Sequence, residues 1–147
     1  MAFATNPDGH RNFSILETLE AGLALTGPEV KSIKRGDCSL KGAHAVVHGN
    51  SLMLVNMHVG LYKPAAKVHQ EPERSRRLLV HKKDIARFTG KIRTEGMALI
   101  PLSVYGKGGL VKVELGLGRG KKKYDKRADI KKRDINRDMA QAMRVKG

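Results

Sequence analysis

The chain has 147 residues, enough for one domain with an appendage, and its 29 Lys and Arg outnumber 14 Asp and Glu to give a net charge of +15. This surplus favours a polyanionic partner, and the short apolar runs argue against a membrane. The single cysteine excludes an internal disulfide framework, and the N-terminus lacks the pattern of a signal peptide. We therefore expect a cytoplasmic protein that binds nucleic acid.

The first part of the chain predicts an arm followed by a strand. Residues 1–12 contain proline, glycine and asparagine, which disfavour regular structure, so we expect a flexible N-terminal arm. Residues 13–25 suit a strand in which Gly22 marks a bulge or a bend.

Two short helices are predicted. Thr26 and Glu29 have the spacing of a capping box, which starts a helix over about residues 28–34. Residues 84–93 place their apolar side chains on one face and predict the second helix.

The remaining strands are short and are joined by glycine-rich turns into hairpins. They are expected at residues 43–48, 51–55, 78–81, 97–105 and 110–115. A long polar loop over residues 60–77 is expected to be functional or mobile. Six antiparallel strands with two or three short helices predict a mainly β fold, an OB-like closed six-stranded barrel.

The chain therefore divides into an N-terminal arm (1–12), an OB-like barrel (13–120) and a basic tail (121–147). The tail carries 11 basic and 4 acidic residues. It contains good helix formers but only a thin apolar stripe, so we expect it to be disordered when free and helical when bound.

The segment 116–127 joins the barrel to the tail. Its alternating glycines predict a flexible backbone, and each of its cations can neutralise a phosphate. These cations are Arg119, Lys121, Lys122, Lys123, Lys126 and Arg127. Tyr124 either stacks on a base or packs on the barrel rim, and the sequence leaves both interpretations open.

We find no motif for catalysis. The glycines of segment 116–120 fit neither a Walker loop, which needs Lys followed by Ser or Thr, nor the dinucleotide-binding pattern. The six histidines lack metal-ligand spacing, and Cys38 shows no sign of activation as a nucleophile. We therefore expect a protein that is not an enzyme, with no catalytic residues, no metal and no cofactor.

Several segments resemble the SmpB family, the tmRNA-binding proteins of bacterial ribosome rescue, in their order and spacing. The matching segments are 20–22, 26–33, 72–79, 111–122 and 124–127, of which the last block is the most specific. The resemblance implies a trans-translation adaptor that binds the tRNA-like domain of tmRNA. It would deliver tmRNA to a stalled bacterial-type 70S ribosome, where the tail senses the empty decoding centre and mRNA channel beside 16S rRNA. It further implies a monomer, with elongation factor Tu as an indirect partner through charged tmRNA.

The resemblance and the basic segment together assign site residues by position. The residues expected to bind tmRNA are Glu20, Leu79, His81, Lys112, Arg119, Gly120, Lys121 and Lys122. The residues expected at the decoding centre and mRNA channel are Tyr124, Asp125, Lys126, Arg127, Ile135, Met139 and Met143. Each residue expected to bind tmRNA also has a purely structural interpretation. For Leu79 the residues alone favour the core, since apolar side chains are usually buried, and His81 can cap the second helix.

The sequence departs from the family pattern at three places. Asn6 is followed by Pro-Asp-Gly in place of a basic run, and Arg11-Asn12-Phe13 replaces a His-Asp/Glu-Tyr trio. Gly106 stands where an aromatic residue is common, which predicts a more mobile hairpin. Two other classes of protein remain as alternatives. One is a generic OB-fold RNA-binding or ribosome-associated protein, and the other is a nuclease or RNA-modifying enzyme.

Overall fold

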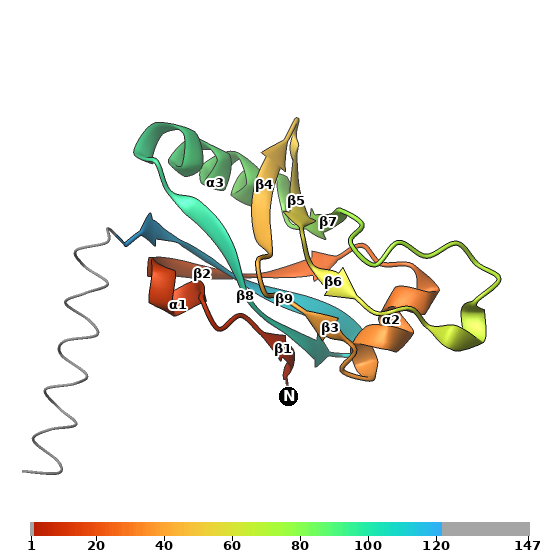
Figure 1. The fold of residues 1–147 in the computed structure, drawn as a ribbon. Coiled ribbons are helices and arrows are strands. Elements are labelled where there is room, and N and C mark those ends of the chain that lie inside the picture. The colour runs from red at the N-terminus through yellow and green to blue at the C-terminus, as the bar shows by residue number, and fades with distance from the viewer. Residues whose placement is uncertain (1, 122–147) are drawn as a thin grey trace, which may run out of the picture.

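A computed structural model describes residues 2–121 of the chain (Figure 1). Strands dominate it, and three helices and one 3-10 turn (Lys63–Ala65) complete it. The helices are α1 (Gly9–Asn12), α2 (Gly27–Lys34) and α3 (Lys82–Glu95). The strands are β1 (Ala2–Thr5), β2 (Phe13–Leu23), β3 (Cys38–Ser39), β4 (His44–His48), β5 (Ser51–Val55), β6 (His58–Val59), β7 (Arg76–Leu79), β8 (Ala98–Lys107) and β9 (Leu110–Gly120).

Six of these strands form a closed ring. Their order is β8-β4-β5-β7-β2-β9, and β9 pairs again with β8, so that every neighbour in the ring is antiparallel. β1 adds to the outside of this ring along β8, and β3 pairs with β6 in a separate two-stranded sheet. The prediction of a mainly β fold with six closed antiparallel strands is therefore confirmed.

The core lies inside the ring. Leu52, Leu54 and Leu115 are fully buried there, because alternate side chains of each strand point inward. Ile33 of α2 and Phe88 of α3 belong to the same buried cluster, although the two helices lie toward opposite ends of the ring (Figure 1). The helices thus cover the ring with side chains whose spacing in the sequence already marked them as apolar faces.

The local signals for turns and caps are confirmed. Thr26 and Glu29 form both hydrogen bonds of a capping box at the start of α2: the Glu29 amide donates to Thr26 Oγ1 (3.4 Å), and the Thr26 amide donates to Glu29 Oε1 (2.9 Å). His48 pairs with Ser51 across the predicted two-residue turn of the β4–β5 hairpin.

The N-terminal segment contains regular structure, so the expectation that it lacks any is wrong for residues 2–5 and 9–12. β1 pairs with β8, and the Asn6 side chain donates to the carbonyl oxygen of Pro101 (2.9 Å). Local composition disfavours a strand here, but the available edge of β8 supplies hydrogen-bond partners that no local pattern reveals.

The Phe3 ring lies against Gly106, the position where the family pattern has an aromatic residue. A Cβ built on Gly106 would be 3.3 Å from two atoms of that ring. The N-terminal strand therefore packs an aromatic ring on the hairpin at the position where Gly106 has no side chain.

The glycines of segment 116–120 lie within β9, not in a flexible joint, which corrects that prediction for this part of the segment. A Cβ on Gly118 would lie 2.1 Å from the Ser14 carbonyl oxygen, and one on Gly116 would lie 3.0 Å from the Ile15 and Leu102 side chains. These glycines therefore let β9 pack closely against its neighbours. The register shift of β2 falls between Ile15 and Glu17, so the bulge, one of the two alternatives predicted at Gly22, is not at that position.

A buried cluster of charges holds the long loop between β6 and β7. Arg76 is completely buried, and its guanidinium donates to Glu29 Oε2 (2.7 Å) and to the carbonyl oxygens of Met57 (2.8 Å) and Pro72 (3.2 Å). Arg74 donates to the other carboxylate oxygen of Glu29 (2.6 Å). The two arginines that the sequence placed in a polar loop thus tie that loop to α2.

The Glu29 carboxyl is strongly acidic. Burial raises its pKa, but the hydrogen bonds from the Arg74 side chain, the Thr26 backbone and Arg76 together lower it to about 2. The carboxylate is therefore ionised at neutral pH and compensates the buried charge of Arg76.

Candidate nucleic-acid interface

A groove of about 670 Å³ opens where β2, β7 and β9 meet the start of α3. Its lining includes four residues from the predicted tmRNA-binding set, which are Glu20, Leu79, His81 and Lys112. They come from four elements or their flanks and span more than ninety positions of the chain. The structure therefore brings half of that set into a single hollow.

Strand pairing explains how these residues meet. Gly22 of β2 pairs with Leu79 of β7 on one side and with Lys112 of β9 on the other. β7 alternates strictly, with Arg76 and Leu78 buried and Arg77 and Leu79 exposed. Leu79 is 46% exposed, so the expectation that it belongs to the core is wrong.

Glu20 presents a fixed, ionised carboxylate. The Tyr105 hydroxyl donates to its Oε2 (2.5 Å), and the Lys107 ammonium group donates to its Oε1 (3.3 Å). The Tyr105 hydrogen bond lowers the pKa of Glu20, partial desolvation opposes it, and Lys107 and Lys112 lower it further. A carboxylate held in this way accepts hydrogen bonds from ribose hydroxyl or base amino groups and repels phosphates, so it can orient an RNA strand.

His81 occupies the N-cap position of α3. Its carbonyl oxygen accepts hydrogen bonds from the amides of Asp84 and Ile85, both at 3.0 Å. Its imidazole makes no capping hydrogen bond. The side chain is exposed at the groove, so it caps the helix by position only and is available to a ligand.

The groove also holds two cations that the sequence analysis did not assign to it. Arg77 and Lys82 are exposed in its lining, and neither forms an ion pair with any residue between 2 and 121. Arg77 could have been found by extending the predicted strand two residues toward the N-terminus, because period-two alternation then places it on the same face as Leu79. With Lys112, these side chains make the groove a place where phosphates can be neutralised.

The remaining described residues of the predicted set lie at the opposite end of β9. Arg119 is exposed and lies 3.8 Å from Glu95, and the amide of Lys121 donates to the carbonyl oxygen of Asn12 (2.8 Å). Gly120 pairs with Phe13 between them. Eight strand positions separate Lys112 from Gly120, which is about 26 Å. The set is therefore split between two ends of one strand.

The other predicted site residues lie outside the described residues: one of the tmRNA-binding set, and every residue expected at the decoding centre and mRNA channel. These positions are Lys122, Tyr124, Asp125, Lys126, Arg127, Ile135, Met139 and Met143.

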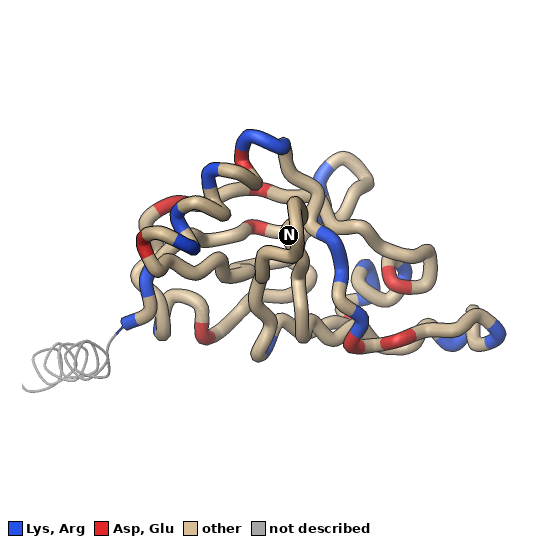
Figure 2. The backbone as a smooth tube through the Cα atoms, turned by 90° about the horizontal axis from the view of Figure 1, so that it is seen from above, with Lys and Arg blue, Asp and Glu red and all other residues tan. Residues whose placement is uncertain are grey.

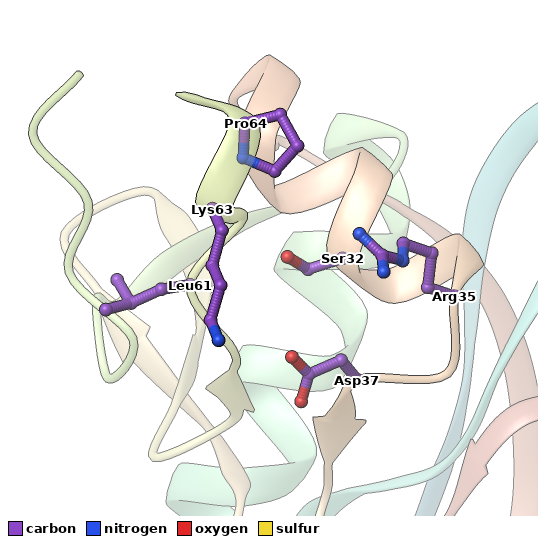
Figure 3. A pocket seen from close by; sticks show the side chains of 6 residues that line it. All are labelled: Ser32, Arg35, Asp37, Leu61, Lys63 and Pro64. Carbon is purple, nitrogen blue, oxygen red and sulfur yellow. The ribbon is translucent and has the colours of Figure 1, made fainter. Parts of the chain in front are cut away.

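Lys and Arg alternate with Asp and Glu along much of the described backbone (Figure 2). A second hollow of about 510 Å³ lies between α2 and the loop after β6 (Figure 3). Arg35 and Lys63 line it together with Asp37, and the Arg35 guanidinium lies 5.7 Å from the centre of the Tyr62 ring. None of the predicted site residues between positions 2 and 121 lines this hollow.

Among residues 2–121, no cluster of His, Cys, Asp and Glu could hold a metal ion, and no helix is long and apolar enough to cross a membrane. Burial, with help from the Asp37 charge, raises the pKa of the Cys38 thiol. A thiol of this kind is a poor nucleophile.

Comparison with known proteins adds independent observations. The family model described as SmpB protein matches residues 3–145. An SsrA-binding protein of Pelotomaculum thermopropionicum is 49% identical over 139 residues, covering 95% of this chain and 91% of its own. That of Desulforudis audaxviator is 50% identical over 141 residues, covering 96% and 92%.

A solved structure is similar as well. One chain of the structure described as "tmRNA-SmpB: a journey to the center of the bacterial ribosome" superposes with a TM-score of 0.67 and is 36% identical, covering 86% of this chain and 92% of its own. The match to the family model extends over nearly the whole sequence, and the relatives agree with it along their lengths. The chain therefore belongs to the SmpB family.

Proposed function

We propose that this protein binds tmRNA and delivers it to stalled ribosomes as the adaptor of trans-translation. The observation that carries this proposal is the groove that gathers Glu20, Leu79, His81 and Lys112 from separate elements. The SsrA-binding relatives and the similarity to a chain of the tmRNA–SmpB ribosome structure support it.

Within this function, the groove holds the tRNA-like domain. Lys112, Arg77 and Lys82 neutralise phosphates, while the Glu20 carboxylate accepts hydrogen bonds from sugars or bases. Arg119 and Gly120, with Lys121 and Lys122, continue the contact toward the tail. The tail positions from Tyr124 to Met143 named above enter the decoding centre and the mRNA channel.

The protein acts by binding alone. It performs no covalent step, works in the cytoplasm as a monomer, and meets elongation factor Tu only through charged tmRNA. The net charge of +15 supports electrostatic attraction to RNA, so we expect affinity to fall steeply as salt increases.

A competition gel shift tests the proposal. At moderate salt the full chain should prefer tmRNA over an equal mass of tRNA. Equal binding would instead favour a generic OB-fold RNA-binding protein, because charge alone does not distinguish the two RNAs. Incubation of tmRNA with the protein and a divalent metal ion should leave the RNA intact, and cleavage would favour a nuclease.

A second experiment tests the division between body and tail. Deletion of residues 125–147 should preserve tmRNA binding and abolish tagging on stalled ribosomes. Loss of tmRNA binding in this truncation would contradict the assignment of RNA binding to the groove.

A further inference from the structure

An apolar hollow of about 300 Å³ adjoins the groove on the side of α2. Its apolar lining comes from Leu25 before α2, Val30 in α2, Leu79 at the end of β7 and Leu110 at the start of β9. Leu110 is 61% exposed and Leu79 is 46% exposed, so two of the five large exposed apolar side chains of the described chain line this one hollow. Neighbouring exposed apolar groups are a feature of binding sites.

The hollow and the groove form a continuous surface. Gly22, Leu79 and Lys112 line both of them. Gly22 is the position at which β2 pairs with both β7 and β9, so these two strands diverge around the shared residues. A ligand that fills the groove therefore lies directly at the mouth of the hollow.

The hairpin that presents Leu110 has a tight turn that contacts α2. Gly108 and Gly109 have positive φ angles of 58° and 78°, which a tight two-residue turn of this kind requires. The Lys34 ammonium group donates to the carbonyl oxygen of Gly109 (3.4 Å), which ties the turn to α2. Leu110 is thus presented at the hollow before a ligand arrives, and little conformational freedom is lost on binding.

The chemistry of the hollow matches that of a single nucleotide. Its floor is aliphatic, and its rim carries the cations Lys112 and Lys34. A nucleotide has the same two-part character, with an apolar base face and an anionic phosphate. None of the described residues that line the hollow is aromatic, so aliphatic side chains are the groups that it offers to a base.

We propose that the hollow formed by Leu25, Val30, Leu79 and Leu110 receives one unstacked nucleobase of the tRNA-like domain bound in the groove. This inference rests on the proposed function and adds an apolar base contact to a site that otherwise binds through charge and hydrogen bonds. Leu110 is the residue that completes the hollow, and the base packs between it and Leu79.

The test compares Leu110→Ser with Leu61→Ser in the full chain. Leu61 is 58% exposed and lines the second hollow, so the control removes a side chain of the same kind and similar exposure. Affinity for the isolated tRNA-like domain of tmRNA is measured by fluorescence anisotropy at several salt concentrations. We expect Leu110→Ser to weaken binding about tenfold and Leu61→Ser to leave it unchanged.

Further readouts distinguish an apolar base contact from a lost phosphate contact and from a folding defect. The slope of affinity against salt should remain that of the unmodified protein in Leu110→Ser, because no phosphate contact is lost. Chemical probing of the RNA should show one base protected by the unmodified protein and by Leu61→Ser but reactive with Leu110→Ser. Leu110→Met should restore the affinity, and equal melting temperatures of the variants exclude a folding defect.

The outcomes separate this inference from the function on which it rests. Unchanged affinity of Leu110→Ser, or a reduced salt slope, overturns the base contact while leaving the adaptor function intact. Normal RNA binding with weakened ribosome binding assigns the hollow to a ribosomal occupant and also overturns it. If the unmodified protein itself shows no preference for tmRNA over tRNA, the proposed function fails first.

Discussion

The two ends of the β2–β9 pair both contain closely packed glycines but differ in what surrounds them, since a Cβ on Gly22 would also lie only 3.2 Å from the Leu79 Cβ. At one end, Gly118 lets β9 approach β2 so closely that a Cβ would reach the Ser14 carbonyl oxygen. At the other end, Gly22 pairs with both Leu79 and Lys112 where β7 and β9 diverge, and the groove opens there. The glycine-rich end is therefore held by close contact between strands, whereas most of the described residues expected to bind tmRNA lie where the strands part.

The largest expected effect comes from removing the support of β7 at the groove end. Arg76→Met should lower the free energy of unfolding by about 3–5 kcal/mol, because it breaks a buried ion pair with Glu29 and removes the side-chain hydrogen bond to the carbonyl oxygen of Met57. Urea unfolding measures this. The neighbouring Arg77→Met is the matched control and should change stability by less than about 0.5 kcal/mol, since Arg77 is exposed. Similar stabilities of the two variants would contradict the structural role of the cluster.

The same cluster predicts acid sensitivity. Because the folded protein lowers the pKa of Glu29 from 4.5 to about 2, the carboxylate contributes stability that is fully present above pH 4.5. That contribution, at most about 3 kcal/mol, is lost as the pH falls from 4.5 toward 2. Thermal melts across this window should show the loss in the unmodified protein and a shallower dependence in Glu29→Gln. Equal slopes would show that other carboxylates dominate.

The packed end is tested by adding one methyl group. Gly118→Ala should destabilise the protein by about 1–3 kcal/mol or more, because the Cβ would collide with backbone that cannot move independently of β2. Gly90→Ala is the control within α3, where a Cβ meets nothing within 4 Å, and it should stabilise the protein by about 0.5–1 kcal/mol. If Gly118→Ala melts like the unmodified protein, the glycine there serves flexibility after all.

The smallest expected effects concern RNA affinity at the two ends. Lys112→Ala and Arg119→Ala should each weaken binding of the tRNA-like domain severalfold and reduce the salt slope by about 1, since each removes one phosphate contact. Lys63→Ala, outside both ends, should leave the slope unchanged. A change in slope at Lys112 alone would confine the RNA to the groove end and remove Arg119 from the interface.

Much of the fold could be predicted because its signals are local. The capping box of Thr26 and Glu29 and the two glycine-containing hairpin turns are readable from neighbouring residues, and the structure contains them. The predictions that were wrong concern residues whose contact partners are distant in the sequence. The close approach of Gly118 to Ser14 and the pairing of β1 with β8 involve residues about one hundred positions apart.

For the candidate site, too, some residues could be predicted from the sequence, whereas their arrangement depends on long-range contacts. The resemblance supplied Glu20, Leu79, His81 and Lys112, but only the three-dimensional pairing at Gly22 explains why they share a groove. Arg77 was missed because the predicted strand began at Leu78, and the burial of Arg76 depends on Glu29, 47 positions earlier. RNA contact by each of these residues stays a prediction.

The most direct test of the account is amide chemical-shift mapping of the full chain during titration with the tRNA-like domain of tmRNA. The account predicts the largest shifts at Glu20, Leu79, His81 and Lys112, with Leu110 among them, and small shifts around Arg35 and Lys63. Shifts concentrated around Arg35 and Lys63, with the groove unaffected, would contradict the assignment of RNA binding to the groove.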